Sequence, residues 1–214
     1  MRLSPQWLRF LERKISWIAI PNIGVLIVTL QALGFLMVST NPTWIDKLAL
    51  IPEAVIQGEY WRLITFLSLP LSMSPIWVVF VLWFLYFILN AIESEWGAFK
   101  TTLYVLLSYL LTVGFSFLFN YPITQISDFE ATLFLAAASL FPEVEVRLFM
   151  LVPVKMKWLG LISGAFLLLR FVQSDWLGRF YLLAIYFNYL VFFGPALLDT
   201  LKQKYRSWNY RRKL

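Results

Sequence analysis

The chain alternates between long apolar runs and short stretches that hold most of its charged residues. An apolar helix of about 20 residues crosses the hydrocarbon core of a bilayer, which is about 30 Å thick. The pattern therefore predicts six membrane-spanning helices, near residues 20–38, 75–92, 101–119, 129–141, 157–172 and 179–198. The fourth run is short, so we expect its neighbours to shield it from lipid, or its helix to begin in polar surroundings.

The composition supports this interpretation. Sixty per cent of the 214 residues are hydrophobic, 14% are charged, and the mean hydropathy is +0.73. These values lie outside the range of a soluble domain. The sequence predicts an all-α integral membrane protein, with a six-helix membrane domain at residues 18–200. A cytoplasmic amphipathic lead-in at 1–17 and a basic cytoplasmic tail at 201–214 flank this domain.

The segment between the first two predicted helices, residues 39–74, is too long for a simple connection. It is rich in apolar residues, but Pro42, Pro52 and Pro70 prevent a spanning helix. We expect this segment to have its own structure, half inserted in the outer leaflet. Tyr60 and Trp61 should then lie at the level of the lipid headgroups.

Lysine and arginine are distributed unevenly among the connecting segments. With both termini in the cytoplasm, 14 of the 18 basic residues fall on the inner side of the membrane, where such residues are retained. The compact chain without a retention signal favours a bacterial inner membrane. The basic residues of the tail are interleaved with Tyr205, Trp208 and Tyr210. We expect them to attract the anionic lipid of the bilayer and not to bind nucleic acid.

The sequence lacks the residues that several kinds of intramembrane catalysis require. The chain has no cysteine and no histidine, so thiolate chemistry and the His-Glu-x-x-His motif of metalloproteases are excluded. Asp128 and Asp199 fall at ends of predicted helices, without the flanking motif of an aspartyl pair. A glycine-rich phosphate loop is also missing. We therefore expect no metal and no cofactor.

Three motifs nevertheless resemble those of the rhomboid intramembrane serine proteases and of the related derlins. The segment 58–65 is similar to the rhomboid outer-loop pattern and contains the pair Trp61-Arg62. Glu93 and Gly97, four positions apart, are similar to the ExxxG at the end of the second rhomboid helix. Residues 140–142, Leu-Phe-Pro, resemble the end of the fourth helix.

The resemblance implies a six-helix rhomboid-like bundle with a membrane-embedded first outer loop. In such a fold Trp61 and Arg62 have a structural role, in which Arg62 bonds backbone carbonyls of that loop. Glu93 has two interpretations at this stage. A buried carboxylate would hydrogen-bond loop backbone, whereas an exposed one would reach the membrane surface.

The catalytic positions of the family are degenerate in this chain. The residue at the place of the nucleophile is Ser127, which lacks the flanking glycines and is followed by Asp128. The residue at the place of the general base is Asn188, and an amide cannot accept the serine proton. The resemblance therefore implies no catalytic residues, with Ser127 and Asn188 as degenerate equivalents.

Together these observations predict a catalytically inactive rhomboid-like pseudoprotease, not an enzyme, that binds transmembrane client proteins or a membrane protein partner. Two alternatives stay open. One is a small multi-pass transporter or channel, although paired polar breaks at the midplane of the membrane are not evident. The other is an active rhomboid protease with a non-standard site.

Overall fold

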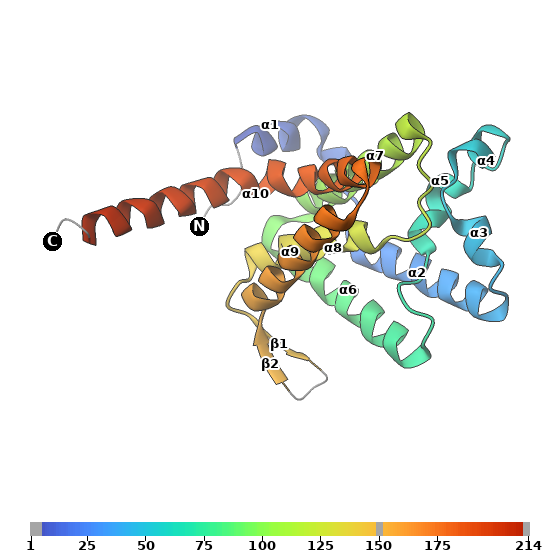
Figure 1. Cartoon of the computed structure of the whole chain (residues 1–214), viewed down its shortest axis with the longest axis horizontal. Coiled ribbons are helices and arrows are strands. Elements are labelled where there is room, and N and C mark those ends of the chain that lie inside the picture. The colour runs from blue at the N-terminus through green and yellow to red at the C-terminus, as the bar shows by residue number, and fades with distance from the viewer. Residues whose placement is uncertain (1–5, 149–151, 212–214) are drawn as a thin grey trace.

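The structure, a computed structural model, describes residues 6–148 and 152–211 (Figure 1). Five of its helices are long and apolar enough to cross a membrane. They are α2 (Ile23–Thr40), α6 (Pro75–Trp96), α7 (Ala98–Phe119), α9 (Met156–Gln173) and the Trp176–Gly194 part of α10 (Trp176–Arg211). The prediction of a helical multi-pass membrane protein is confirmed at this level.

The fourth predicted span corresponds to α8 (Ser127–Leu140), which has only 14 residues. A helix of that length extends about 21 Å, less than the thickness of the hydrocarbon core. It packs against α6, α7, α9 and α10, and is therefore the central helix. Its residues Ala136 and Ala137 are fully buried, because small side chains let neighbouring helices approach closely.

The 39–74 segment has a structure of its own, as the sequence predicts, and this structure consists of short helices. They are α3 (Trp44–Leu48), α4 (Pro52–Ile56), α5 (Arg62–Thr65) and the 3₁₀ turn η2 (Phe66–Ser68). The segment packs against α2 so closely that a Cβ on Gly34 would lie 1.8 Å from the carbonyl oxygen of Ser68. Figure 1 shows these helices gathered at one end of the bundle, which we call the loop end, opposite both termini.

The turn between α6 and α7 consists of Gly97 alone. Its φ of 84° is a conformation that residues with a Cβ rarely adopt. Glu93 and Gly97 therefore lie together at the far end of the bundle from the 39–74 segment.

The lead-in predicted at residues 1–17 contains helix α1 (Gln6–Ile15) and the 3₁₀ turn η1 (Ser16–Ile18). Lys100 at the start of α7 forms an ion pair of 3.8 Å with Glu12 of α1. This contact ties the lead-in to the bundle.

A two-stranded hairpin was not predicted. Strands β1 (Glu145–Leu148) and β2 (Val152–Lys155) pair antiparallel between α8 and α9. Glu143, just before β1, accepts hydrogen bonds from Lys155 at 2.9 Å and Lys157 at 2.6 Å. These ion pairs close the base of the hairpin.

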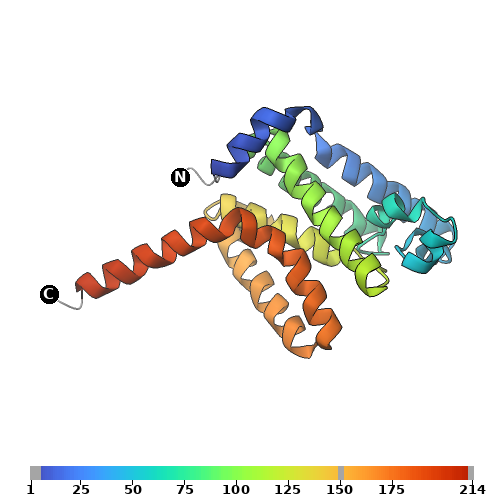
Figure 2. The same cartoon turned by 90° about the horizontal axis from the view of Figure 1, so that it is seen from above.

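Helix α10 continues through the predicted sixth span into the basic tail, and ends at Arg211. Figure 2 shows that it changes direction partway along, so that its last part runs away from the bundle. Pro195 lies inside the helix, where it removes the hydrogen bond to Val191 and favours a bend.

Candidate functional site

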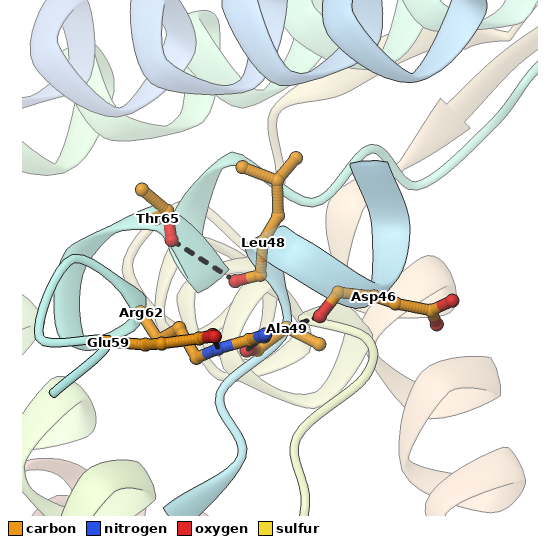
Figure 3. A network of polar contacts seen from close by, with 6 residues as sticks. All are labelled: Asp46, Leu48, Ala49, Glu59, Arg62 and Thr65. Atoms are coloured by element: carbon orange, nitrogen blue, oxygen red, sulfur yellow. Dashed lines mark hydrogen bonds and ion pairs between the residues drawn. The ribbon is translucent and has the colours of Figure 1, made fainter. Parts of the chain in front are cut away.

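Arg62 organises the 39–74 segment through its guanidinium group (Figure 3). The side chain is buried, and its Nη1 donates to the backbone oxygens of Ala49, at 2.8 Å, and of Asp46. Its Nε forms an ion pair of 2.5 Å with Glu59. The carbonyl contacts that the sequence predicts for Arg62 are thus present, and they hold α3 against α5.

Trp61 has a different position from its neighbour. Its side chain is 54% exposed, and Tyr60, Ile56 and Ile64 are also exposed. These four residues form an apolar rim on the 39–74 segment. In a bilayer such a rim contacts lipid or headgroups, so Trp61 contributes to the outside of the segment and not to its interior.

Glu93 acts at the opposite end of the bundle. Its Oε1 accepts a hydrogen bond of 2.8 Å from the backbone N–H of Asn22, the residue before α2. The carboxylate is half-buried and satisfies one of the amides left unpaired at the start of that helix. Glu93 thus combines features of its two interpretations, because it bonds backbone as a buried carboxylate would, yet it is only half-buried.

The loop end of α8 carries two buried acids with separate partners. Asp128 forms a two-pronged ion pair with Arg170 of α9, at 2.5 and 3.3 Å. Glu130 accepts a hydrogen bond from the side-chain amide of Gln31 on α2. The central helix is thus linked by polar contacts to α9 on one side and to α2 on the other.

Asn188 lies at the centre of a third polar network, which joins α7, α8 and α10. Its side chain is fully buried, and its Nδ2 donates to the backbone oxygen of Tyr104 at 2.9 Å and to Ser108 Oγ at 2.6 Å. The hydroxyl of Tyr104 donates to the backbone oxygen of Thr132, at 2.9 Å, on α8. This network is structural, because every bond in it joins one helix to the next.

Ser127 and Asn188 lie on different helices, α8 and α10. Ser127 is the first residue of α8 and is half-buried, and it shares no hydrogen bond with Asn188 in the part of the chain that the structure describes. Another serine, Ser139, does contact α10, through a hydroxyl–hydroxyl contact of 2.6 Å with Tyr189. A neutral phenol is a weak base, so this pair does not supply the proton acceptor that a serine nucleophile needs.

Residues 6–148 and 152–211 contain no group of three or more aspartate or glutamate side chains placed so that they could hold a metal ion.

Sequence reasoning missed most of these partners. The polar residues Gln31, Ser108, Glu130 and Thr132 interrupt apolar runs, and such residues usually face the interior of a helix bundle. That signal identifies the interior faces of the helices, although it does not say which residue pairs with which.

A small niche reaches the central helix from the side of α6. It has a volume of about 170 Å³ and is lined by Phe87, Ile88 and Ala91 of α6, Ala137 of α8 and the first residue of α9, Met156, among others. Its lining is mainly apolar. One of the small residues of α8, Ala137, thus lines the niche.

Comparisons with family models, curated proteins and solved structures find no match to this chain. The rhomboid resemblance therefore stays a prediction from the chain's own motifs.

Proposed function

We propose that this protein is a catalytically inactive, rhomboid-like membrane protein that binds transmembrane clients or a membrane protein partner. In this proposal α8 also spans the membrane, as the fourth of six spans in chain order, both termini are cytoplasmic and the membrane is a bacterial inner membrane. The observation that carries the proposal is the position of Asn188. Asn188 would occupy the place of the base. The nitrogen of its side-chain amide donates hydrogen bonds that hold α10 to α7, and in this proposal it has no role in proton transfer.

The surroundings of Ser127 also argue against cleavage. The negative charge that develops during acyl transfer needs hydrogen-bond donors around it. Ser127 is followed by the carboxyl group of Asp128, and Glu130 lies one turn further along the same helix. Asp128 is paired with Arg170, so its charge does not decide the matter. What argues against cleavage here is that Ser127 lacks the flanking glycines that would let a substrate backbone approach.

Two features support binding to transmembrane clients. The niche beside Ala137 would accept a side chain from a client helix that lies against α6 and α8. The apolar rim of residues Ile56, Tyr60, Trp61 and Ile64 on the half-inserted 39–74 segment favours a locally thinner bilayer. Such thinning costs a fraction of a kcal/mol per Å of mismatch, and it would loosen a client helix from its surrounding lipid.

Photocrosslinking in the membrane tests the proposal. Phe87 lines the niche, whereas Phe166 on α9 is a phenylalanine 62% exposed on a helix with little buried surface. A photoreactive benzoylphenylalanine at position 87 should capture discrete membrane proteins that the same residue at position 166 does not. Equal or diffuse capture from the two positions would contradict client binding at the niche.

The buried carboxyl group of Glu130 favours a second candidate, a transporter or channel. An ionisable group inside a helix bundle often marks an ion or proton pathway. Its partner here is Gln31, and neither residue lines the niche. Ion or solute flux into vesicles that contain the purified protein, abolished by Glu130→Gln, would favour this candidate over client binding.

A further inference from the structure

A second cavity, larger than the niche, lies between the loop-end halves of α7 and α10. This groove has a volume of about 440 Å³. Every residue that lines it is apolar, and the residues that define its two walls are Leu110, Gly114 and Leu118 of α7 with Phe180, Ala184 and Phe187 of α10. Leu118 is 81% exposed and Phe187 is 56% exposed, so the groove opens on the outside of the bundle.

The length of the groove corresponds to one leaflet of a bilayer. On α7 its lining runs from Leu110 to the last helical residue, Phe119. Ten helical residues extend about 15 Å, which is half of the roughly 30 Å hydrocarbon core. Trp176, the first residue of α10, lies near the end of the groove that is closest to the loop end of the bundle. Its ring packs edge-on against that of Phe180, with ring centroids 5.8 Å apart. A tryptophan in this position is typical of the membrane–water interface.

The groove closes near the middle of the bundle. The residue after Phe187 is Asn188, whose side-chain amide donates hydrogen bonds to the backbone oxygen of Tyr104 and to the hydroxyl of Ser108. Further on, the rings of Tyr104 and Phe192 are in edge contact, with centroids 5.0 Å apart. The two helices are therefore in direct contact along the other half of their length.

This geometry distinguishes between the apolar occupants that a membrane offers. A transmembrane helix crosses both leaflets and would need a groove along the whole of α7 and α10. A hydrocarbon chain from one leaflet needs only half that length and no polar partner. We propose that the groove binds one acyl chain of a lipid from the leaflet at the loop end of the bundle.

Gly114 provides a way to fill the groove without disturbing the protein. A Cβ added to Gly114 meets no other atom within 4 Å, and the same holds for Gly164 on α9. Both glycines are helical and half-buried. Gly114→Phe therefore places a ring in the groove, and Gly164→Phe is a matched control away from it. Gly114→Leu is a second, smaller filling variant.

The experiment uses the purified full chain in dodecyl maltoside with phosphatidylcholine that carries a diazirine in the middle of one acyl chain. After irradiation, adducts should saturate and map to residues 110–119 and 180–187. Gly114→Phe should weaken half-saturation about tenfold, which corresponds to about 1.4 kcal/mol, and Gly164→Phe should leave it unchanged.

Three results would overturn the proposal. The first is labelling that does not saturate or that spreads evenly over lipid-facing residues, α9 included. The second is an equal effect of the Gly114 and Gly164 variants. The third is displacement of the lipid from the groove by a single-span peptide with the same diazirine at its midpoint, which would make the groove a helix-binding site. Client capture at position 87 is independent of all three.

Discussion

The side-chain amide of Asn188 on α10 donates to the hydroxyl oxygen of Ser108 on α7 at 2.6 Å, across 80 positions of sequence. The same amide nitrogen donates to the backbone oxygen of Tyr104. A carbonyl oxygen only accepts hydrogen bonds, so the orientation of the amide is fixed. The amide nitrogen of Asn188 is therefore a donor to two acceptors, the reverse of what the general base implied by the proposed resemblance would do.

Asn188→Asp tests this assignment with almost no change in shape. The substitution places an oxygen against the carbonyl of Tyr104 and leaves buried acceptors unpaired, at a cost of about 1–3 kcal/mol each. We expect the variant to unfold at clearly lower temperature in detergent. Asn90→Asp makes the same chemical change on an exposed face of α6, and should alter stability by no more than about 0.5 kcal/mol. Similar melting of the two variants would show that the amide bonds of Asn188 contribute nothing.

Arg62→Ala should destabilise the 39–74 segment. It removes the donor to the carbonyls of Asp46 and Ala49, each worth about 1–3 kcal/mol when buried and unpaired. Lys47→Ala is the control, since Lys47 is exposed and its ammonium only lies 4.9 Å from the ring of Trp44, a contact worth about 0.5 kcal/mol. Thermal unfolding of both variants in the same detergent measures the difference. Equal effects would mean that Arg62 is no more than a surface charge.

Ser127 should be inert towards serine-directed reagents. With no base in contact, its hydroxyl is a weak nucleophile, so a fluorophosphonate should not label the protein above background. Mass spectrometry of the intact chain after treatment measures this. Labelling that Ser127→Ala abolishes would establish an active serine, and cleavage of a transmembrane substrate would then be expected as well.

Both termini should face the cytoplasm, because 14 of the 18 basic residues fall on that side. Reporters that are active on one side of the membrane only, fused in turn to each terminus and inserted between residues 57 and 58, measure the orientation. The two terminal fusions should agree and the insertion should report the opposite side. Termini on opposite sides would exclude a bundle with six spans.

Glu143 lies outside the spanning helices, and its carboxyl group should have a pKa below the usual range of a glutamate. Hydrogen bonds from Lys157 and Lys155 lower its pKa from the usual 4.5, and Glu143 in turn raises the pKa of Lys155. The pairing therefore supports the hairpin above the ordinary carboxyl pKa and is lost as the pH falls through the lowered one. Carbon NMR of the labelled carboxyl group gives the midpoint directly. Lys157→Ala should move it upward, whereas Lys202→Ala, at a distant exposed lysine, should not.

The helices that the sequence predicts well are those with an unambiguous local signal. Pro75 marks the start of α6 because proline suits the first turn of a helix. The same helix ends later than predicted, at Trp96, because polar residues such as Asn90 and Glu93 continue it beyond its apolar run. Apolarity predicts the part of a helix that lies in lipid, and not where the helix ends.

The hairpin and the polar networks depend on contacts that a single sequence does not reveal. Val146 lies between Glu145 and Arg147 in the period of a strand, but four residues are too few to distinguish a strand from a loop. The pairs Asn188–Ser108 and Glu130–Gln31 join positions 80 and 99 residues apart. The sequence predicts that each of these residues lies inside the membrane, but it does not identify the residue with which each one pairs.

The single-residue turn at Gly97 has a consequence for how the chain is inserted during synthesis. Two helices of 22 residues each are joined there without a loop, so they have to enter the bilayer together as one hairpin. Lys100 is the only basic residue near the turn, and Glu93 and Glu95 lie beside it. This hairpin therefore has almost no orienting charge of its own, and we expect the basic residues that precede α2 and those between α8 and α9 to determine its orientation in the membrane.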